Sequence, residues 1–215
     1  MGNNFIYEKL ILIPALLIAF TFHEYAHAKM ADKLGDKTPR FQGRLTLNPA
    51  SHIDPLGALM ILLCGFGWAK PVQTNPQVYK NYYKDDLKVS IAGPLANLAV
   101  GIVGCFIWVL LVKIQYSTGL YSVPVFSVIV DIFSTIFSLN VSLFIFNLLP
   151  IPGLDGFAVL RDLKPDFFYK ISESLYRYQY IIIVLILIGG SRIISIPVQI
   201  ICNFILKIAR AVVGI

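Results

Sequence analysis

Long apolar runs separated by short polar stretches make up most of this chain. They cover residues 5–30, 89–112 and 123–149, and a closing pair covers 178–188 and 193–213. A bilayer core is crossed by about 20 consecutive apolar residues in a helix. The pattern therefore predicts an all-α polytopic membrane protein, a bundle of about five transmembrane helices.

A shorter apolar segment, residues 53–68, lies between two basic stretches and does not fit this pattern. It is short for a span, and three glycines within it allow a bend. We therefore expect a re-entrant or hairpin-like segment near residues 41–68, which enters the membrane and returns on the same side. Just before it, the alternation in Leu45-Thr46-Leu47 predicts a short strand or hairpin at the membrane surface.

Composition supports a membrane protein built as a single domain over residues 1–215. The chain is 57% hydrophobic and only 14% charged, with a mean hydropathy of +0.72, whereas soluble domains carry about 25% charged residues. The net charge of +6 comes from Lys and Arg in the loops between apolar runs. That distribution fits the positive-inside rule and argues against a nucleic-acid partner.

The first apolar run ends in a motif with metal chemistry, His23-Glu24-Tyr25-Ala26-His27. Residues four apart lie on one face of a helix, so His23 and His27 can direct two imidazoles at one zinc ion. Glu24 lies beside that face, where it can act as the general base on a metal-bound water. The alternative is a chance match, in which neighbouring helices satisfy two core histidines.

A catalytic zinc site needs a third protein ligand and an open position for water. Asp155 is the strongest candidate, because it follows an apolar run within a Pro- and Gly-rich stretch that cannot form regular helix. Irregular backbone at membrane depth is tolerated where it lines a wet cavity. The alternative is an ordinary turn at the water interface with a solvated aspartate.

Three motifs in this order resemble the site-2 protease family of intramembrane zinc metalloproteases. They are His23-Glu24-Tyr25-Ala26-His27, Gly93-Pro94-Leu95-Ala96-Asn97 and the run from Asn147 to Gly156. The resemblance implies one Zn2+ per chain held by His23, His27 and Asp155, with Glu24 as the catalytic base. It also implies that Asn97 and Asn147 hold the substrate strand or the site itself. Pro152 lies in a stretch, 150–154, that we expect to be extended and to pair with the substrate.

The stretches from Leu45 to Pro49, from His52 to Gly57 and from Phe66 to Pro71 resemble the compact prokaryotic subgroup of this family. No insertion is long enough for a PDZ-like or CBS-like domain. The shared catalytic core would cover about residues 5–160, followed by a C-terminal helix pair over about 174–213. The resemblance implies cleavage of peptide bonds within or near transmembrane segments, as in regulated intramembrane proteolysis, in the prokaryotic inner membrane.

A parity argument predicts the topology of such a site. If Asp155 meets His23 and His27, then the first run must end, the run 89–112 must begin and the run 123–149 must end on one side of the membrane. That side would hold most loop cations and would be cytoplasmic. They are Lys29, Lys33, Lys37, Arg40, Arg44, Lys70, Lys80, Lys84, Lys88, Arg161, Lys164, Lys170 and Arg177.

Two other functions compete with proteolysis. A transporter or metal permease could use the histidines and acidic groups as a pathway, but it would need further ionisable groups in other spans. Asp131 is the notable one. An inactive scaffold of the same fold is the other alternative, although His23, Glu24, His27 and Asp155 are all present.

Overall fold

The computed structural model describes residues 2–64, 67–186 and 191–214. In these ranges it contains four helices long and apolar enough to cross a membrane. They are α1 (Gly2–Lys33), α4 (Tyr82–Thr118), α5 (Pro124–Asn147) and α8 (Ser191–Val213). This confirms an all-α membrane protein, with four such helices in the described ranges where the sequence predicted about five.

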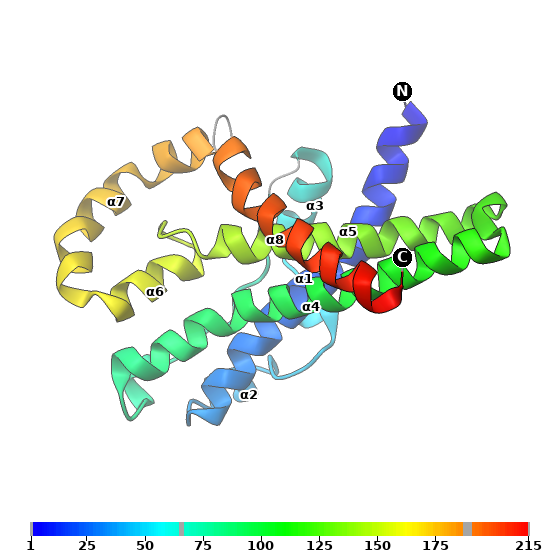
Figure 1. Cartoon of the computed structure of the whole chain (residues 1–215). Coiled ribbons are helices and arrows are strands. Elements are labelled where there is room, and N and C mark those ends of the chain that lie inside the picture. The colour runs from blue at the N-terminus through cyan, green and yellow to red at the C-terminus, as the bar shows by residue number, and fades with distance from the viewer. Residues whose placement is uncertain (1, 65–66, 187–190, 215) are drawn as a thin grey trace.

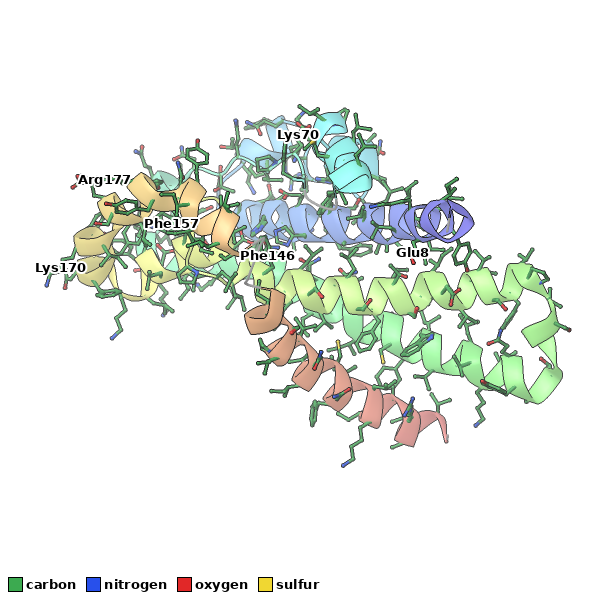
Figure 2. All side chains as sticks on the ribbon, turned by 90° about the horizontal axis from the view of Figure 1, so that it is seen from above. Glu8, Lys70, Phe146, Phe157, Lys170 and Arg177 are labelled. Carbon is green, nitrogen blue, oxygen red and sulfur yellow. The ribbon has the colours of Figure 1, made fainter. Side chains whose placement is uncertain are left out.

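The spanning helices form a layered bundle (Figures 1 and 2). A tight connection through η3 (Leu120–Ser122) joins α4 and α5 as an antiparallel pair. Helix α1 packs on one side of this pair and α8 packs on the other. The core between α4, α5 and α8 is apolar and consists of Cys105, Val109, Phe137, Val141, Ile205 and Ala209.

The segment after α1 folds back on itself, as the sequence predicted. It contains α2 (Thr38–Phe41), η1 (Pro49–Ser51) and α3 (Pro55–Cys64), and α3 is only about 15 Å long at 1.5 Å per residue. An antiparallel bridge pairs Ile53 with Ala69, so both ends of the hairpin lie side by side, and α3 is too short to span a hydrocarbon core of about 30 Å.

The predicted strand at Leu45-Thr46-Leu47 is wrong, because the chain bends there instead of extending. Local hydrogen bonds explain the bend. The Thr46 hydroxyl accepts a hydrogen bond from the Asn48 N–H at 3.1 Å, and the Thr46 carbonyl lies 2.7 Å from His52 Nε2. Short-range bonds of this kind compete with strand pairing.

The C-terminal third begins with α6 (Asp155–Leu163), which packs against α4. Helix α7 (Pro165–Leu185) then arcs away from the bundle (Figure 1). Lys170, Glu173 and Arg177 keep α7 from being apolar enough to span. The first member of the predicted closing pair is therefore the end of this longer helix. The last two residues of the predicted segment 178–188 lie outside the described ranges.

The end of α1, the start of α4 and the end of α5 meet at one end of the bundle, which is the arrangement of helix ends that the parity argument requires. His27 of α1 contacts Val89 near the start of α4, and Asp155 follows α5. Helix α8 ends at the opposite end of the bundle, where Lys113 Nζ donates to the Val213 carbonyl at 2.5 Å. Arg210 lines the same hollow as Lys113, so this end carries more positive charge than the loop sequence indicated.

Candidate metal centre

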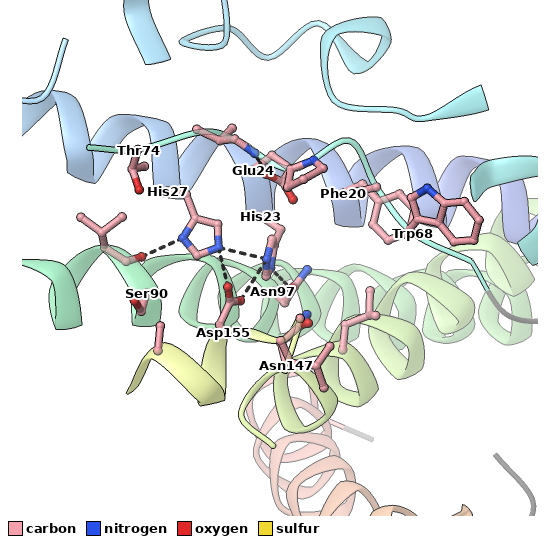
Figure 3. A pocket seen from close by; sticks show the side chains of 18 of the residues that line it. Phe20, His23, Glu24, His27, Trp68, Thr74, Ser90, Asn97, Asn147 and Asp155 are labelled. Atoms are coloured by element: carbon pink, nitrogen blue, oxygen red, sulfur yellow. Dashed lines mark hydrogen bonds and ion pairs between the residues drawn. The ribbon is translucent and has the colours of Figure 1, made fainter. Parts of the chain in front are cut away.

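Two helices and a turn bring the three predicted metal ligands together (Figure 3). His23 and His27 lie one turn apart on α1, and Asp155 is the first residue of α6. The Nε2 atoms of the histidines are 3.1 Å apart. Each also faces one oxygen of Asp155, at 3.2 Å from His23 and 3.3 Å from His27. One potential ligand atom of each residue therefore points to a common centre.

The partners of the opposite ring nitrogens set the tautomers of the two histidines. His27 Nδ1 lies 2.7 Å from the Val89 carbonyl, which can only accept, so Nδ1 carries the proton. His23 Nδ1 lies 2.7 Å from Asn97 Oδ1. The Asn97 amide donates to the carbonyl of Ala19, which fixes its oxygen toward His23. With the proton held on Nδ1, each imidazole in its neutral form presents a bare Nε2 lone pair to the centre.

Zinc fits this donor set. Two bare Nε2 atoms cannot hydrogen-bond to each other, and the buried Oδ2 of Asp155 has no hydrogen-bond partner in the structure. A cation between three lone-pair donors held this close would satisfy all of them at once. Tetrahedral ligands about 2.0–2.2 Å from one zinc ion lie roughly 3.3–3.5 Å apart, close to the observed separations.

Gly93 of α4 forms the wall behind the imidazoles. A Cβ atom built at this position would lie 2.2 Å from His27 Nε2 and 2.7 Å from His23 Cε1. No larger residue fits without displacing a ligand. The sequence analysis gave Gly93 no role of its own, although a glycine inside an apolar helix usually marks a close approach of this kind.

Glu24 lies beside the ligands and is 6% exposed. Its Oε2 accepts a hydrogen bond of 2.7 Å from the backbone N–H of Val72. Figure 3 shows the chain between Trp68 and Thr74 passing over α1 next to Glu24. A carboxylate that is held by one bond and faces a cavity can accept a proton there.

A cavity of about 510 Å³ opens in front of these side chains. An extended stretch that follows the hairpin, residues 67–74, forms one wall through Gly67, Trp68, Ala69, Pro71, Val72 and Thr74. Asn147 also lines it, whereas Pro152 is buried and is not among the lining residues. The prediction that 150–154 is extended is wrong. Ile151 N–H bonds to Leu149 O and Leu154 N–H bonds to Ile151 O, which folds this stretch into turns.

Asn97 is fully buried and supports His23 from behind. Both of its amide hydrogens are used, toward Ala19 O at 3.1 Å and Asn140 Oδ1 at 2.9 Å. Of the two roles expected for Asn97, this arrangement favours holding the site over contacting substrate. Sequence reasoning missed Asn140, which is also fully buried and orients the Asn97 amide.

Asn97→Ala is expected to lower zinc affinity about 10- to 100-fold, because His23 loses the acceptor that fixes its tautomer and ring orientation. Asn147→Ala is the matched control: Asn147 lines the cavity but contacts no ligand in the structure. Titration with a competing chelator measures both proteins. Equal affinities for the two variants would contradict the supporting role of Asn97.

A second polar contact joins α6 to α4. Arg161 of α6 pairs with Asp86 of α4 and with its neighbour Asp162. Burial opposes its charge, but the hydrogen bond and charge of Asp162, aided by Asp86, raise the pKa of Arg161. This ion-pair cluster, which the sequence did not reveal, ties the helix that carries Asp155 to the bundle.

Helices of a membrane bundle that enclose a His-His-Asp group, a carboxylate and a cavity define a membrane metallopeptidase. Comparison with known proteins agrees. The family model of Peptidase family M50 matches residues 112–189, which include Asp155. The chain belongs to this family, which confirms the resemblance to site-2 proteases.

Three relatives illustrate the similarity. "Putative zinc metalloprotease YwhC" of Bacillus subtilis is 44% identical over 168 residues, covering 76% of this chain and 75% of the relative. A Rip2 protein of Mycolicibacterium smegmatis with the same description is 31% identical over 188 residues, covering 83% and 67%. MJ0611 of Methanocaldococcus jannaschii, also so described, is 28% identical over 157 residues, covering 71% and 70%. No solved structure matches the chain.

Proposed function

We propose that this protein is an intramembrane zinc endopeptidase that hydrolyses peptide bonds within or near transmembrane segments of other membrane proteins, as in regulated intramembrane proteolysis. The observation that carries this proposal is the convergence of His23, His27 and Asp155 beside Glu24, in a cavity bounded by spanning helices. We assign the first three residues as zinc ligands and Glu24 as the general base. Residues 1–215 act as one peptidase domain, with a core over 5–160 and a C-terminal helical part over 174–213.

Each group at the site has a separate role in the proposed hydrolysis. Zinc bound at such a site lowers the pKa of its water toward about 7 and polarises a carbonyl. Glu24 accepts the proton of the attacking water and returns it to the leaving amine nitrogen. Asn97 and the Val89 carbonyl keep both imidazoles in the tautomer that binds metal. Water reaches the site through the open cavity.

The substrate must unwind before it is cut, because a helical peptide bond is hydrogen-bonded and shielded. The extended stretch 67–74 offers an unwound substrate a wall of backbone next to Glu24. Pairing along such a stretch supplies main-chain hydrogen bonds independent of substrate sequence. Asn147, on the opposite wall in Figure 3, is placed to contact the bound strand. Pro152, which we also proposed as a substrate contact, shapes the turn before Asp155.

Glu24→Gln is expected to reduce cleavage about 100- to 10,000-fold while zinc stays bound. Glutamine keeps an oxygen that can accept from the Val72 N–H but cannot take up the proton, so the fold and metal site should persist. Cleavage of a model transmembrane substrate in detergent or liposomes, with zinc content measured in parallel, tests this. A Glu24→Gln protein that cleaves at the normal rate would refute the proposed mechanism.

We further propose that the protein spans the prokaryotic inner membrane several times, with the site opening toward the cytoplasm. Residues 29–88, from the end of α1 to the start of α4, and residues 161–177 together carry 13 of the 18 Lys and Arg residues, as the positive-inside rule requires of the cytoplasmic side. A cysteine introduced at Asn75, in the cavity-side stretch between α3 and α4, is expected to react only with reagents that reach the cytoplasm. A cysteine at Ser117, near the end of α4, is the opposite control. Labelling of position 75 from outside would reverse the topology.

Asp131 does not require a transport function. Its Oδ2 accepts a hydrogen bond of 2.6 Å from the Tyr7 hydroxyl, which links the start of α1 to α5. An intramembrane carboxylate satisfied in this way has a structural explanation. Asp131, the ionisable residue on which the transporter alternative relied, therefore joins α1 to α5.

A further inference from the structure

We propose that Arg44 is a positioning residue that locks the extended wall of the cavity over Glu24, an inference that rests on the proposed role of Glu24. Arg44 lies in the loop between α2 and η1 and is only 5% exposed. Its Nη1 donates to the Ser51 carbonyl and its Nη2 donates to the Lys70 carbonyl. One guanidinium group therefore clamps two chain segments that enter and leave the α3 hairpin.

The two clamped segments are the two ends of that hairpin, where the chain enters and leaves it. Next to them, the Lys70 N–H donates to the His52 carbonyl at 3.0 Å, and Ile53 is bridged to Ala69. His52 is fully buried, and burial lowers its pKa despite its bond to Thr46. The neutral ring donates through Nε2 to the Thr46 carbonyl at 2.7 Å, which pins the loop that carries Arg44.

A displacement of these two hairpin ends would also displace the backbone that holds Glu24. Val72, whose N–H holds Glu24 Oε2 at 2.7 Å, comes two residues after Lys70. Two residues of chain span at most roughly 7 Å, so a shift at Lys70 moves the Val72 N–H and the wall residues Gly67 and Trp68 with it. Arg44 thus acts on the reaction through the backbone without touching the substrate.

The geometry demands arginine rather than another cation. A guanidinium is a rigid planar fork whose donors can satisfy two carbonyls at once, whereas a lysine ammonium is a point charge on a flexible stem. We therefore expect Arg44→Lys to hold the two segments less well even though it keeps the charge. Arg44→Met should release them while filling a similar volume.

The first measurement compares these variants with the wild type as full-length proteins. Arg44→Met is expected to lower kcat/KM on a model transmembrane substrate about 10- to 100-fold, the cost of misplacing a reacting group by roughly 1 Å. Arg44→Lys should fall between Arg44→Met and wild type. Zinc content should not change, because Arg44 contacts no ligand. The proposal would be overturned if Arg44→Met had the kcat/KM of the wild type. It would also be overturned if Arg44→Met lost activity only in proportion to a loss of bound zinc.

A disulfide supplies the decisive second measurement. Facing residues of an antiparallel bridge lie about 4.5–5.5 Å apart between Cα atoms, within the range a disulfide spans. Ile53→Cys with Ala69→Cys, in a background with Cys64, Cys105 and Cys202 replaced by alanine, should restore activity to Arg44→Met when oxidised and lose it again on reduction. Restored activity would assign a geometric role to Arg44, because the disulfide replaces the clamp but not the positive charge that interacts electrostatically with Glu24.

Two controls separate the possible failures. The same oxidised disulfide in the Arg44 protein sets the reference rate, which oxidised Arg44→Met should approach, and no restoration toward that rate in a zinc-loaded, cross-linked Arg44→Met protein would refute the positioning role. Should Arg44→Met fail to fold, the Arg44→Lys protein undergoes the same oxidation and reduction. Glu24→Gln, assayed alongside, reports on the proposed function itself: if it retains activity, the role of Glu24 falls, whatever the Arg44 variants show.

Discussion

Asp155→Ala is expected to lower zinc affinity by more than the roughly 10- to 100-fold that loss of a supporting hydrogen bond costs, and to abolish peptidase activity. Asp155 brings the only negative charge to the group of three ligand atoms. Without it, the two neutral imidazoles on α1 remain 3.1 Å apart, but nothing closes the site from the α6 side. Zinc content after dialysis against a weak chelator, measured by elemental analysis, gives the readout.

Asp166→Ala is the matched control, since it removes an exposed carboxylate from the first turn of the next helix. It should leave zinc binding unchanged. Asp155→Asn separates charge from shape, because the amide keeps an oxygen near His23 and His27 but lacks the negative charge. Full zinc binding by Asp155→Ala would remove Asp155 from the ligand set and reopen the question of the third ligand.

Gly93→Ala is expected to inactivate the enzyme while leaving the bundle folded. The new methyl group would lie 2.2 Å from His27 Nε2, so the imidazole must swing away and the ligand geometry is lost. Alanine is favoured over glycine in a helix by about 1 kcal/mol. The thermal stability of the metal-free protein should therefore not fall in proportion to the loss of zinc. Zinc titration and thermal unfolding in detergent, measured together, reveal this separation.

Gly101→Ala provides the comparison on the same helix. Its added Cβ would meet Val141 Cγ2 at 3.2 Å, which affects packing between α4 and α5 but no zinc ligand. We expect Gly101→Ala to bind zinc normally. If Gly93→Ala also binds zinc and cleaves normally, the imidazoles can move further than the structure indicates.

Local patterns in the sequence were sufficient to predict the helical bundle and the three side chains that converge on the candidate metal centre. The His23–His27 spacing and the Pro- and Gly-rich stretch before Asp155 are properties of adjacent residues, so they can be recognised without a fold. Glu24 was placed correctly beside the ligands for the same reason. The short length of residues 53–68 was likewise enough to predict that this segment turns back.

The remaining features depend on contacts between distant residues, which no local pattern encodes. The Asn97–Asn140 bond, the Arg161–Asp86 pair and the Arg44 clamp each join separate elements. The extended wall was assigned to residues 150–154, but it lies at 67–74. Prolines and glycines exclude helix in both stretches, yet they do not distinguish an extended chain from successive turns. Only the hydrogen bonds of the fold do so.

The shortness of α3 also affects the lipids around it. A helix of about 15 Å fills only one leaflet of a hydrocarbon layer about 30 Å thick. Its outward side chains Leu56, Leu59 and Leu63 are 58%, 49% and 66% exposed, so acyl chains of that leaflet pack against them. A helix this short does not support the opposite leaflet, and we expect that leaflet to bend toward its tip. Such local thinning beside the cavity would shorten the distance over which a substrate segment has to leave lipid for water.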